Sequence, residues 1–135
     1  MASQWFSKGL YHFSLGDVAW VSQDIRAMLM RSTYTFDDAD EFVSDLGSTD
    51  NGRLGATLAN KTSTGAGILN ADDCVITATA AVATNAVIVY KYNAADASAL
   101  LLLYIDNFTG LPFTPAASQN VSVGWGNGAN LIARL

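Results

Sequence analysis

The positions of apolar residues predict strands in the second half of the chain. Residues 86–92 read AVIVYKY and residues 99–105 read ALLLLYI. Short apolar runs of this kind, rich in β-branched, aromatic or large aliphatic residues, are typical of β-strands. The turn-rich residues 93–98 between them predict a hairpin. Both runs are apolar on both faces, as expected when each face of a strand meets another sheet or another subunit.

Further segments show shorter or weaker strand patterns. They are residues 24–31, 52–64, 67–76 and 130–135. Turns rich in Gly, Asn, Asp and Ser separate them. Several short strands joined by such turns predict a mainly β protein, either an antiparallel β-sandwich or a jelly roll.

One short helix is expected at residues 37–46. Thr35 precedes it as a candidate cap, and the acidic residues at its start suit the positive end of a helix dipole. Phe42 and Leu46 are four residues apart and would share one face. Gly47 would end the helix.

The first nine residues show no clear period, although they contain Trp5 and Phe6. We expect residues 1–9 to form an N-terminal arm that docks on a neighbouring molecule. Residues 10–135 contain neither an internal repeat nor a linker, so they are expected to form a single β domain.

The amino-acid composition and net charge exclude several classes of function. Half of the 135 residues are hydrophobic and 14% are charged, which excludes a disordered chain and leaves a neutral surface typical of partner interfaces. The net charge is −5 and the seven basic residues are scattered, whereas nucleic-acid binding needs a basic stripe. The longest apolar run, residues 99–105, is too short to cross a bilayer. We therefore expect neither a nucleic-acid partner nor a membrane.

Catalytic chemistry has few candidate residues. His12 is the only histidine and Cys74 the only cysteine, so a Ser-His-Asp or Cys-His site would depend on them and no intrachain disulfide exists. Cys74 lies in an apparent strand, where a free cysteine is usually a small core residue. His12 is expected at the surface or in an interface among aromatic residues. We expect a protein that is not an enzyme.

The acidic residues suggest no cofactor or metal. Those at positions 37–41 lack the alternating spacing, central Gly and terminal Glu of a calcium loop, so a solvated helix start is expected. Asp72 and Asp73 are expected to cap a turn by accepting backbone N–H groups. A metal role for this pair stays open, although no histidine lies near it in sequence.

The glycine-rich residues 124–128 (GWGNG) resemble a nucleotide-binding loop only superficially. A strand pattern follows them, whereas the dinucleotide fingerprint needs a helix there, so a hairpin turn is expected. We expect Trp125 to be exposed at the tip of this turn. Large aromatic residues are enriched at binding hot spots, so the residues expected to contact a partner are Trp5, Phe6, Trp20 and Trp125.

Several segments resemble small structural proteins of tailed bacteriophages. The resemblance covers most of the chain from about Lys8 onward. The segments that carry it are residues 16–20 (GDVAW), 24–29 (DIRAML), 67–73 (GILNADD), the strand at 86–92, 101–106 (LLLYID), and the terminal pattern 121–135 with its single tryptophan.

This resemblance implies a virion component, made in the host cytoplasm. It implies most directly a cement (decoration) protein that binds the major capsid protein on the outer surface of the head and stabilises it. Such proteins are commonly β-sandwiches or jelly rolls and often trimers, so a homotrimer is expected. The alternative is a phage tail or receptor-recognition module that binds host surface glycan through exposed aromatic residues such as Trp125.

Overall fold

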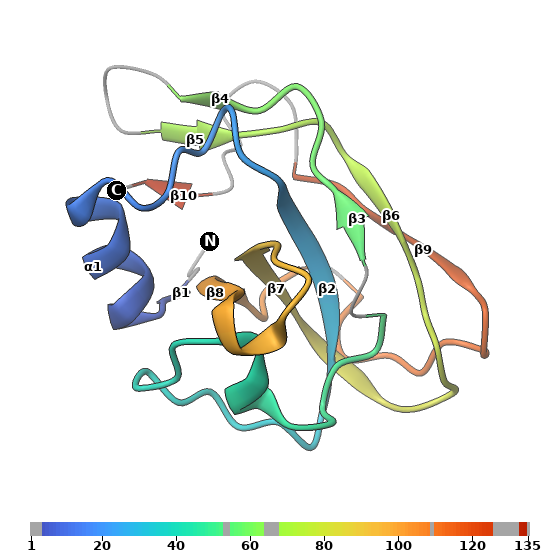
Figure 1. The fold of residues 1–135 in the computed structure, drawn as a ribbon. Coiled ribbons are helices and arrows are strands. Elements are labelled where there is room, and N and C mark those ends of the chain that lie inside the picture. Colours follow the sequence, from blue (N-terminus) through green and yellow to red (C-terminus); the bar gives the residue numbers. More distant parts are fainter. Residues whose placement is uncertain (1–3, 53–54, 64–67, 109, 126–132, 135) are drawn as a thin grey trace.

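The fold is described from a computed structural model that covers residues 4–52, 55–63, 68–108, 110–125 and 133–134 (Figure 1). Its helices are α1 (Ser7–Leu15) and two short 3₁₀ helices, η1 (Val43–Leu46) and η2 (Asp96–Ser98). The longer strands are β2 (Ile25–Arg31), β6 (Cys74–Thr77), β7 (Thr84–Lys91), β8 (Leu100–Ile105) and β9 (Asn120–Val123). The shorter strands are β1 (Gln4–Trp5), β3 (Ala56–Thr57), β4 (Thr62–Ser63), β5 (Ile68–Asn70) and β10 (Ala133–Arg134).

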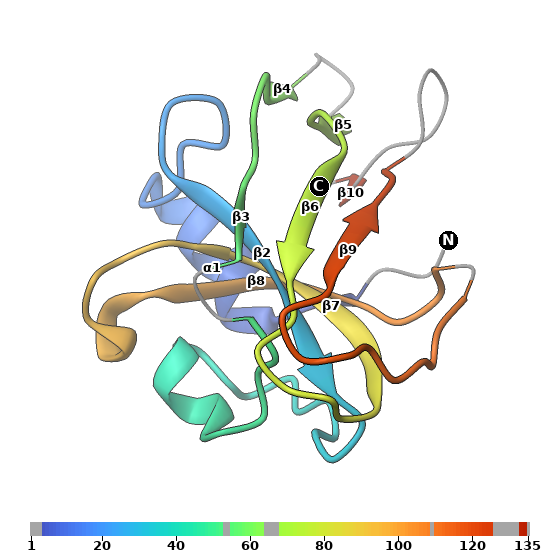
Figure 2. The same ribbon diagram turned by 90° about the vertical axis from the view of Figure 1, so that its right-hand side faces the viewer.

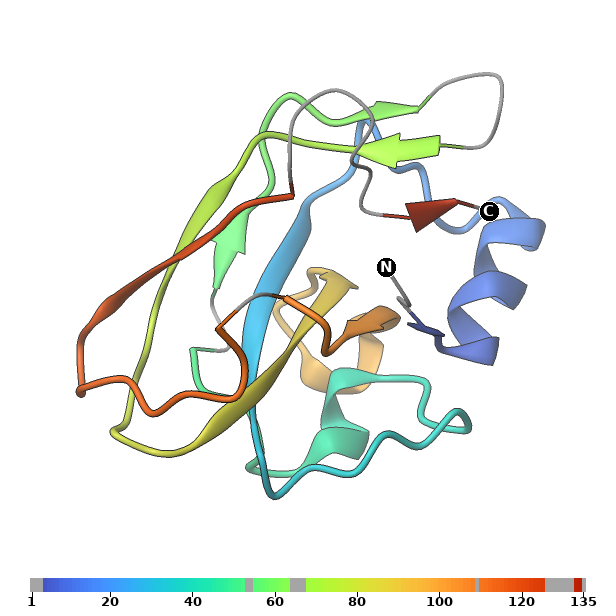
Figure 3. The same ribbon diagram turned by 180° about the vertical axis from the view of Figure 1, so that it is seen from behind.

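The strands form three antiparallel sheets. The largest has the order β1-β8-β7-β2-β3, and two smaller sheets have the orders β10-β5-β4 and β6-β9. In Figure 2, β6 and β9 lie in front of the large sheet and run across its strands. Figures 1 and 3 place α1 at one side of the molecule and the β6-β9 pair at the other. The protein is therefore mainly β with one α-helix, consistent with a β-sandwich, while the jelly-roll alternative is not confirmed.

Both faces of the large sheet are covered by the chain itself. One face packs on the smaller sheets through residues such as Ile25, Val89 and Ile76. The other face packs under the segment that contains η1, through residues such as Met28, Ile88 and Leu46. Successive side chains of β7 alternate between these two clusters, as the period of a strand requires. This arrangement explains why the central strands are apolar at consecutive positions.

The strands that the apolar pattern predicts most strongly are confirmed. The runs at 86–92 and 99–105 correspond to β7 and β8, which pair as an antiparallel hairpin. The run at 24–31 corresponds to β2. The segment 52–64 contains β3 and β4, and the segment 67–76 contains β5 and most of β6.

Two strands toward the end of the chain differ from the expectation. Of the strand expected at residues 130–135, only Ala133–Arg134 lies among the described residues. A strand at Asn120–Val123, which is β9, was not expected from the sequence. Asn120 and Ser122 are exposed there, so its apolar signal is weak.

The helix expected at residues 37–46 is largely wrong. Only its last four residues are helical, as the 3₁₀ helix η1, which begins after Phe42 and not after Thr35. Asp45 explains the start, because its carboxylate accepts the backbone N–H groups of Glu41 and Phe42 at 3.0 and 2.9 Å. Gly47 ends the helix as expected, with a φ of 63°.

The expected arm is part of the fold in every residue that the structure describes. β1 pairs with β8, with Gln4 opposite Tyr104, and the backbone N–H of Phe6 donates to the Leu102 carbonyl at 3.0 Å. The Phe6 side chain is fully buried. α1 starts directly after it, so the boundary expected at residue 9 falls inside a helix; residues 1–3 lie outside the described part.

A buried asparagine fixes the connection between β6 and β7. The Asn51 carbonyl oxygen accepts the backbone N–H groups of Thr79 and Ala80, both at 3.0 Å, and its amide donates to the Thr84 hydroxyl at 3.2 Å. Asn51 is fully buried, so these bonds satisfy a polar group that would otherwise destabilise the fold.

No helix among the described residues has the length and hydropathy that a membrane-spanning segment needs.

Candidate functional site

Most of the aromatic residues expected to contact a partner are buried. Phe6, Trp20 and Trp125 lie in the core, and the exposure expected of Trp125 is wrong, since only 2% of its surface is accessible. Trp125 packs on Phe108 and its backbone N–H donates to Asp73, while the Trp20 indole N–H donates to the Asn70 carbonyl at 3.1 Å. Trp5 is half-buried against Phe13, edge to face. Sequence composition alone does not distinguish an aromatic anchor at the surface from one in the core.

The exposed apolar surface lies instead on α1. Leu10, Tyr11 and Leu15 are exposed by 40%, 53% and 56%, and Lys8 lies over the Tyr11 ring, 5.8 Å from its centroid. With Ser7 and Ser14 these residues form the outer face of the helix. We call Lys8, Leu10, Tyr11 and Leu15 the α1 face. The other large hydrophobic residues exposed in the described part are Val21 and Val75.

α1 is held tightly against the large sheet. Gly9 is its buried residue, and a Cβ added there would lie 2.6 Å from the Leu101 carbonyl oxygen and 3.0 Å from the Leu102 Cα. Glycine therefore allows the helix backbone to approach β8 more closely than any other residue would. At the other end Gly16, with a φ of 82°, turns the chain, and its N–H donates to the Phe13 carbonyl.

Acidic residues in the segment before η1 accept hydrogen bonds from the start of α1 and from Tyr34. Asp38 accepts hydrogen bonds from the backbone N–H of Ser7, at 3.0 Å, and from its hydroxyl, so it satisfies the first turn of α1 from outside. Asp40 accepts a bond from the Tyr34 hydroxyl at 2.9 Å, and burial raises the pKa of both groups. These acids therefore have structural roles and are not the freely solvated helix start that we expected.

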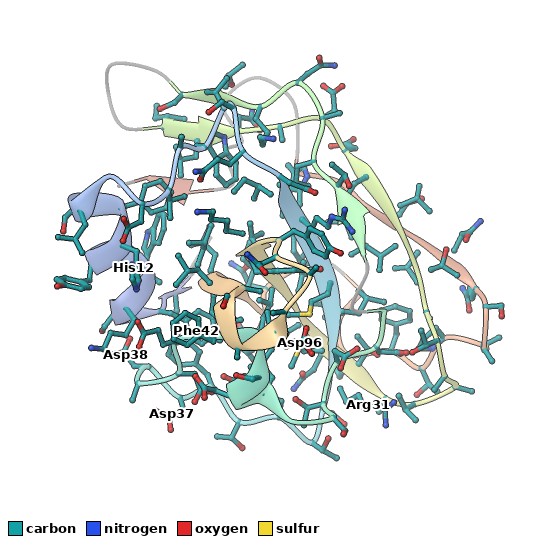
Figure 4. All side chains as sticks on the ribbon, in the orientation of Figure 1. His12, Arg31, Asp37, Asp38, Phe42 and Asp96 are labelled. Atoms are coloured by element: carbon teal, nitrogen blue, oxygen red, sulfur yellow. The ribbon has the colours of Figure 1, made fainter. Side chains whose placement is uncertain are left out.

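His12 is the residue on which the most unusual electrostatic arrangement centres (Figure 4). Its Nδ1 lies 2.7 Å from Asp17 Oδ2 and its Nε2 lies 2.8 Å from Glu41 Oε1. The hydrogen bonds to Asp17 and then to Glu41 raise the pKa of His12, against the opposing effect of burial. His12 is half-buried on the side of α1 that faces the segment before η1; its partners are two carboxylates and one aromatic ring, Tyr11.

The structure places Cys74 in the core, as expected, and the adjacent acids contact distant segments. Cys74 is buried and burial raises its pKa to about 11, so the thiol is unreactive at neutral pH. Asp73 accepts the backbone N–H of Trp125 at 2.9 Å; Trp125 is 52 positions away, so this bond joins two distant segments and does not test the expected turn cap. Asp72 accepts a bond from the Asn60 amide at 2.6 Å. Within the described residues, no group of three His, Cys, Asp or Glu side chains is placed to hold a metal ion.

The structure therefore brings together two features that the sequence did not indicate, the α1 face and the His12 cluster. A signal for the helix was present: Tyr11 and Leu15 are four residues apart, His12 is in the last turn and Gly16 follows, which is a typical helix end. Of residues 124–128, only Gly124 and Trp125 lie in the described part. No protein-family model, curated protein or solved structure matches the chain.

Proposed function

We propose that this protein is a non-enzymatic structural protein of a tailed-phage virion, a cement protein that binds the outer surface of the assembled head through the α1 face. The observation that carries the binding role is the exposure of Leu10, Tyr11 and Leu15 on a helix that is fixed to the sheet. The resemblance to phage structural proteins supplies the virion as the place of action and the major capsid protein as the partner.

A fixed apolar helix suits contact with another protein. Burying an exposed leucine or tyrosine removes apolar surface from water, and tyrosine is enriched at binding hot spots. Because Gly9 and Phe6 already hold α1 in place, binding does not have to order the helix. The α1 face contains one cation, Lys8, so its contacts should depend only weakly on salt.

A cement protein acts by mass action on the particle. It binds the assembled lattice and has no equal site on dispersed subunits, so it shifts the equilibrium toward the intact shell. A contribution of a few kcal/mol from each copy suffices, since many copies bind one shell, and ~2.7 kcal/mol results when the free protein exceeds its dissociation constant 100-fold.

The first test measures copy number in purified virions by quantitative mass spectrometry. Hundreds of copies per particle support the cement role. A few copies would overturn it in favour of the tail or receptor-recognition module, although Trp125, the residue expected to bind glycan there, is buried.

The second test locates the binding surface. Particles that lack the protein are incubated with wild-type protein, Leu15→Glu or Val75→Glu, and bound protein is measured after sedimentation. Leu15 and Val75 are exposed by 56% and 51%, and Val75 lies on β6, on the opposite side of the molecule from α1 (Figures 1 and 3). Loss of binding with Leu15→Glu alone supports the α1 face; equal binding of both variants contradicts it.

The oligomeric state is a separate part of the proposal. The apolar character of β8 on both faces is satisfied within the chain, since all six of its residues are buried, so it no longer argues for a partner. A homotrimer therefore rests on the resemblance alone. Light scattering at micromolar concentration measures it: a trimer mass supports this part, and a monomer mass refutes a trimer that forms in solution.

A further inference from the structure

Both ring nitrogens of His12 lie within hydrogen-bond distance of a carboxylate oxygen. The distances are 2.7 Å to Asp17 and 2.8 Å to Glu41. A neutral imidazole has one N–H donor and one lone pair, whereas a carboxylate only accepts. In the neutral form, one carboxylate would therefore face a lone pair at short distance. Only the doubly protonated ring donates to both partners.

We propose that His12 is a protonation-dependent clasp, which ties the last turn of α1 to the segment before η1 and releases it when the ring loses its proton. The backbones of Asp17 and Glu41 are each held by hydrogen bonds of their own, so the imidazolium joins two fixed points of the fold.

The Glu41 side of the clasp is attached to the large sheet. The backbone N–H of Leu101 donates to the Glu41 carbonyl at 2.9 Å, and the Glu41 N–H donates to Asp45 at 3.0 Å. The next residue, Phe42, forms a β-bridge with Leu100. Figure 4 shows His12 on α1, on the side toward Phe42. Glu41 therefore cannot follow the helix if α1 moves.

The Asp17 side is attached to the end of the helix. The Asp17 N–H donates to the His12 carbonyl at 3.0 Å, and Lys91 of β7 donates to the Asp17 carbonyl at 2.8 Å. His12 is in the last turn of α1, where the negative end of the helix dipole also favours a cation. Two carboxylates and the helix end thus act in the same direction.

The other groups around the ring do not reverse this preference. On α1, the Tyr11 ring contacts the imidazole edge to face and Lys8 lies beyond Tyr11. Of the more distant charges, Lys91 is bonded to the Asp17 carbonyl, Asp45 to backbone N–H groups and Asp38 to Ser7. Toward β8, α1 packs through Gly9 on the backbone of Leu101 and Leu102. Neither leucine has a titratable side chain.

His12 stabilises the folded protein at low pH and not at high pH, because folding raises its pKa. The pKa of His12 is raised above its ordinary value of 6.5, so folding takes up a proton there. The stabilisation is complete below pH 6.5 and is lost as the pH rises through the folded-state pKa. The clasp is therefore closed below the folded-state pKa of His12 and opens above it.

Release has a consequence for the α1 face. Leu15 ends α1 in the same last turn as His12, so opening the clasp loosens part of this surface. This last step rests on the proposed function, whereas the clasp itself does not.

The clasp is tested on the full-length protein by NMR. Because His12 is the only histidine, its ring signals report one titration without overlap. We expect its pKa above 6.5, and we expect Glu41→Gln and Asp17→Asn each to lower its proton affinity about two- to fivefold, as for partly exposed ion pairs. Asp24→Asn is the matched control, because Asp24 is exposed by 40% against 48% for Asp17 and pairs with Arg26.

Hydrogen exchange measures the release. Protection factors of the amides in the last turn of α1 should fall as the pH rises through the His12 titration, while those of β7 do not change. His12→Gln should show no such step. A His12 pKa at or below 6.5, or α1 protection that is constant across the titration, would overturn the clasp. Either result leaves the virion-binding test untouched, since that test uses Leu15 and Val75.

Discussion

Substitution of Gly9 by alanine sets two physical effects against each other. Alanine is the better helix former, and on that ground Gly9→Ala would stabilise α1 by no more than about 1 kcal/mol. The structure predicts the opposite sign. The new Cβ would lie 2.6 Å from the Leu101 carbonyl oxygen and 3.0 Å from the Leu102 Cα, where ordinary contact begins at 3.4 Å.

The magnitude depends on what can move. Both neighbouring atoms belong to the backbone of β8, which is paired on one side with β7 and on the other with β1. The helix cannot withdraw freely, because Phe6 is buried directly before it and donates to Leu102. Overpacking of this kind costs about 1–3 kcal/mol. Because the closest contact is with a backbone atom, we take the upper half of this range, about 2–3 kcal/mol. After a gain in helix propensity of about 1 kcal/mol, the expected net destabilisation is about 1–2 kcal/mol, or ~4–7 °C in Tm for a domain of this size.

Thermal unfolding followed by circular dichroism measures the difference. Ser14→Ala is the control, because Ser14 is on the outer face of the same helix and its substitution improves helix propensity without a clash. Its Tm should stay within about 2 °C of the wild type, as for most surface substitutions. An unchanged or higher Tm for Gly9→Ala would show that α1 does not pack on β8 at this distance.

Three further results are expected. Asn51→Leu leaves the partly buried N–H groups of Thr79 and Ala80 without their acceptor and should cost about 1–3 kcal/mol, read from the urea midpoint; a loss below about 0.5 kcal/mol would contradict the role of Asn51. Asp38→Ala removes the acceptor at the start of α1 and should cost about 1 kcal/mol in thermal unfolding, so an unaltered Tm would argue against that contact. Unfolding curves with and without EDTA should coincide, since no metal-binding group of three is found among the described residues; a shift would point first to Asp72 and Asp73.

The central strands were predictable because burial on both faces makes them continuously apolar. Residues of β2 and β7 alternate between two clusters, and β8 contributes to both, although Leu102 and Leu103 lie in the same one. Both clusters require hydrophobic residues, so the local sequence contains the whole signal. α1 was missed for the opposite reason. Its buried side consists of Gly9 with parts of His12 and Phe13, while Leu10, Tyr11 and Leu15 point outward, so it lacks the apolar stripe of an ordinary surface helix.

The His12 cluster could not be predicted from the sequence, because it is formed by contacts between distant segments. His12 and Glu41 are 29 residues apart, and nothing in either local sequence indicates that they meet. The same holds for the tryptophans, because Trp20 and Trp125 are buried in a core cluster built from distant parts of the chain. The turn role expected of Asp73 used only its own type and position, whereas its observed partner, Trp125, is 52 residues away.

The pairing of β1 with β8 has a consequence for the order of folding during synthesis. Gln4 pairs with Tyr104, so the first described strand has no partner until about a hundred further residues have been made. At 5–20 residues per second this takes about 5–20 s, during which Phe6 and the inner side of α1 have no core to enter. β2 likewise waits for β7, whereas β7 and β8 are adjacent in sequence and pair locally. Folding is therefore delayed until the β7-β8 hairpin emerges, and a nascent chain stopped before residue 100 is a substrate for chaperones and proteases.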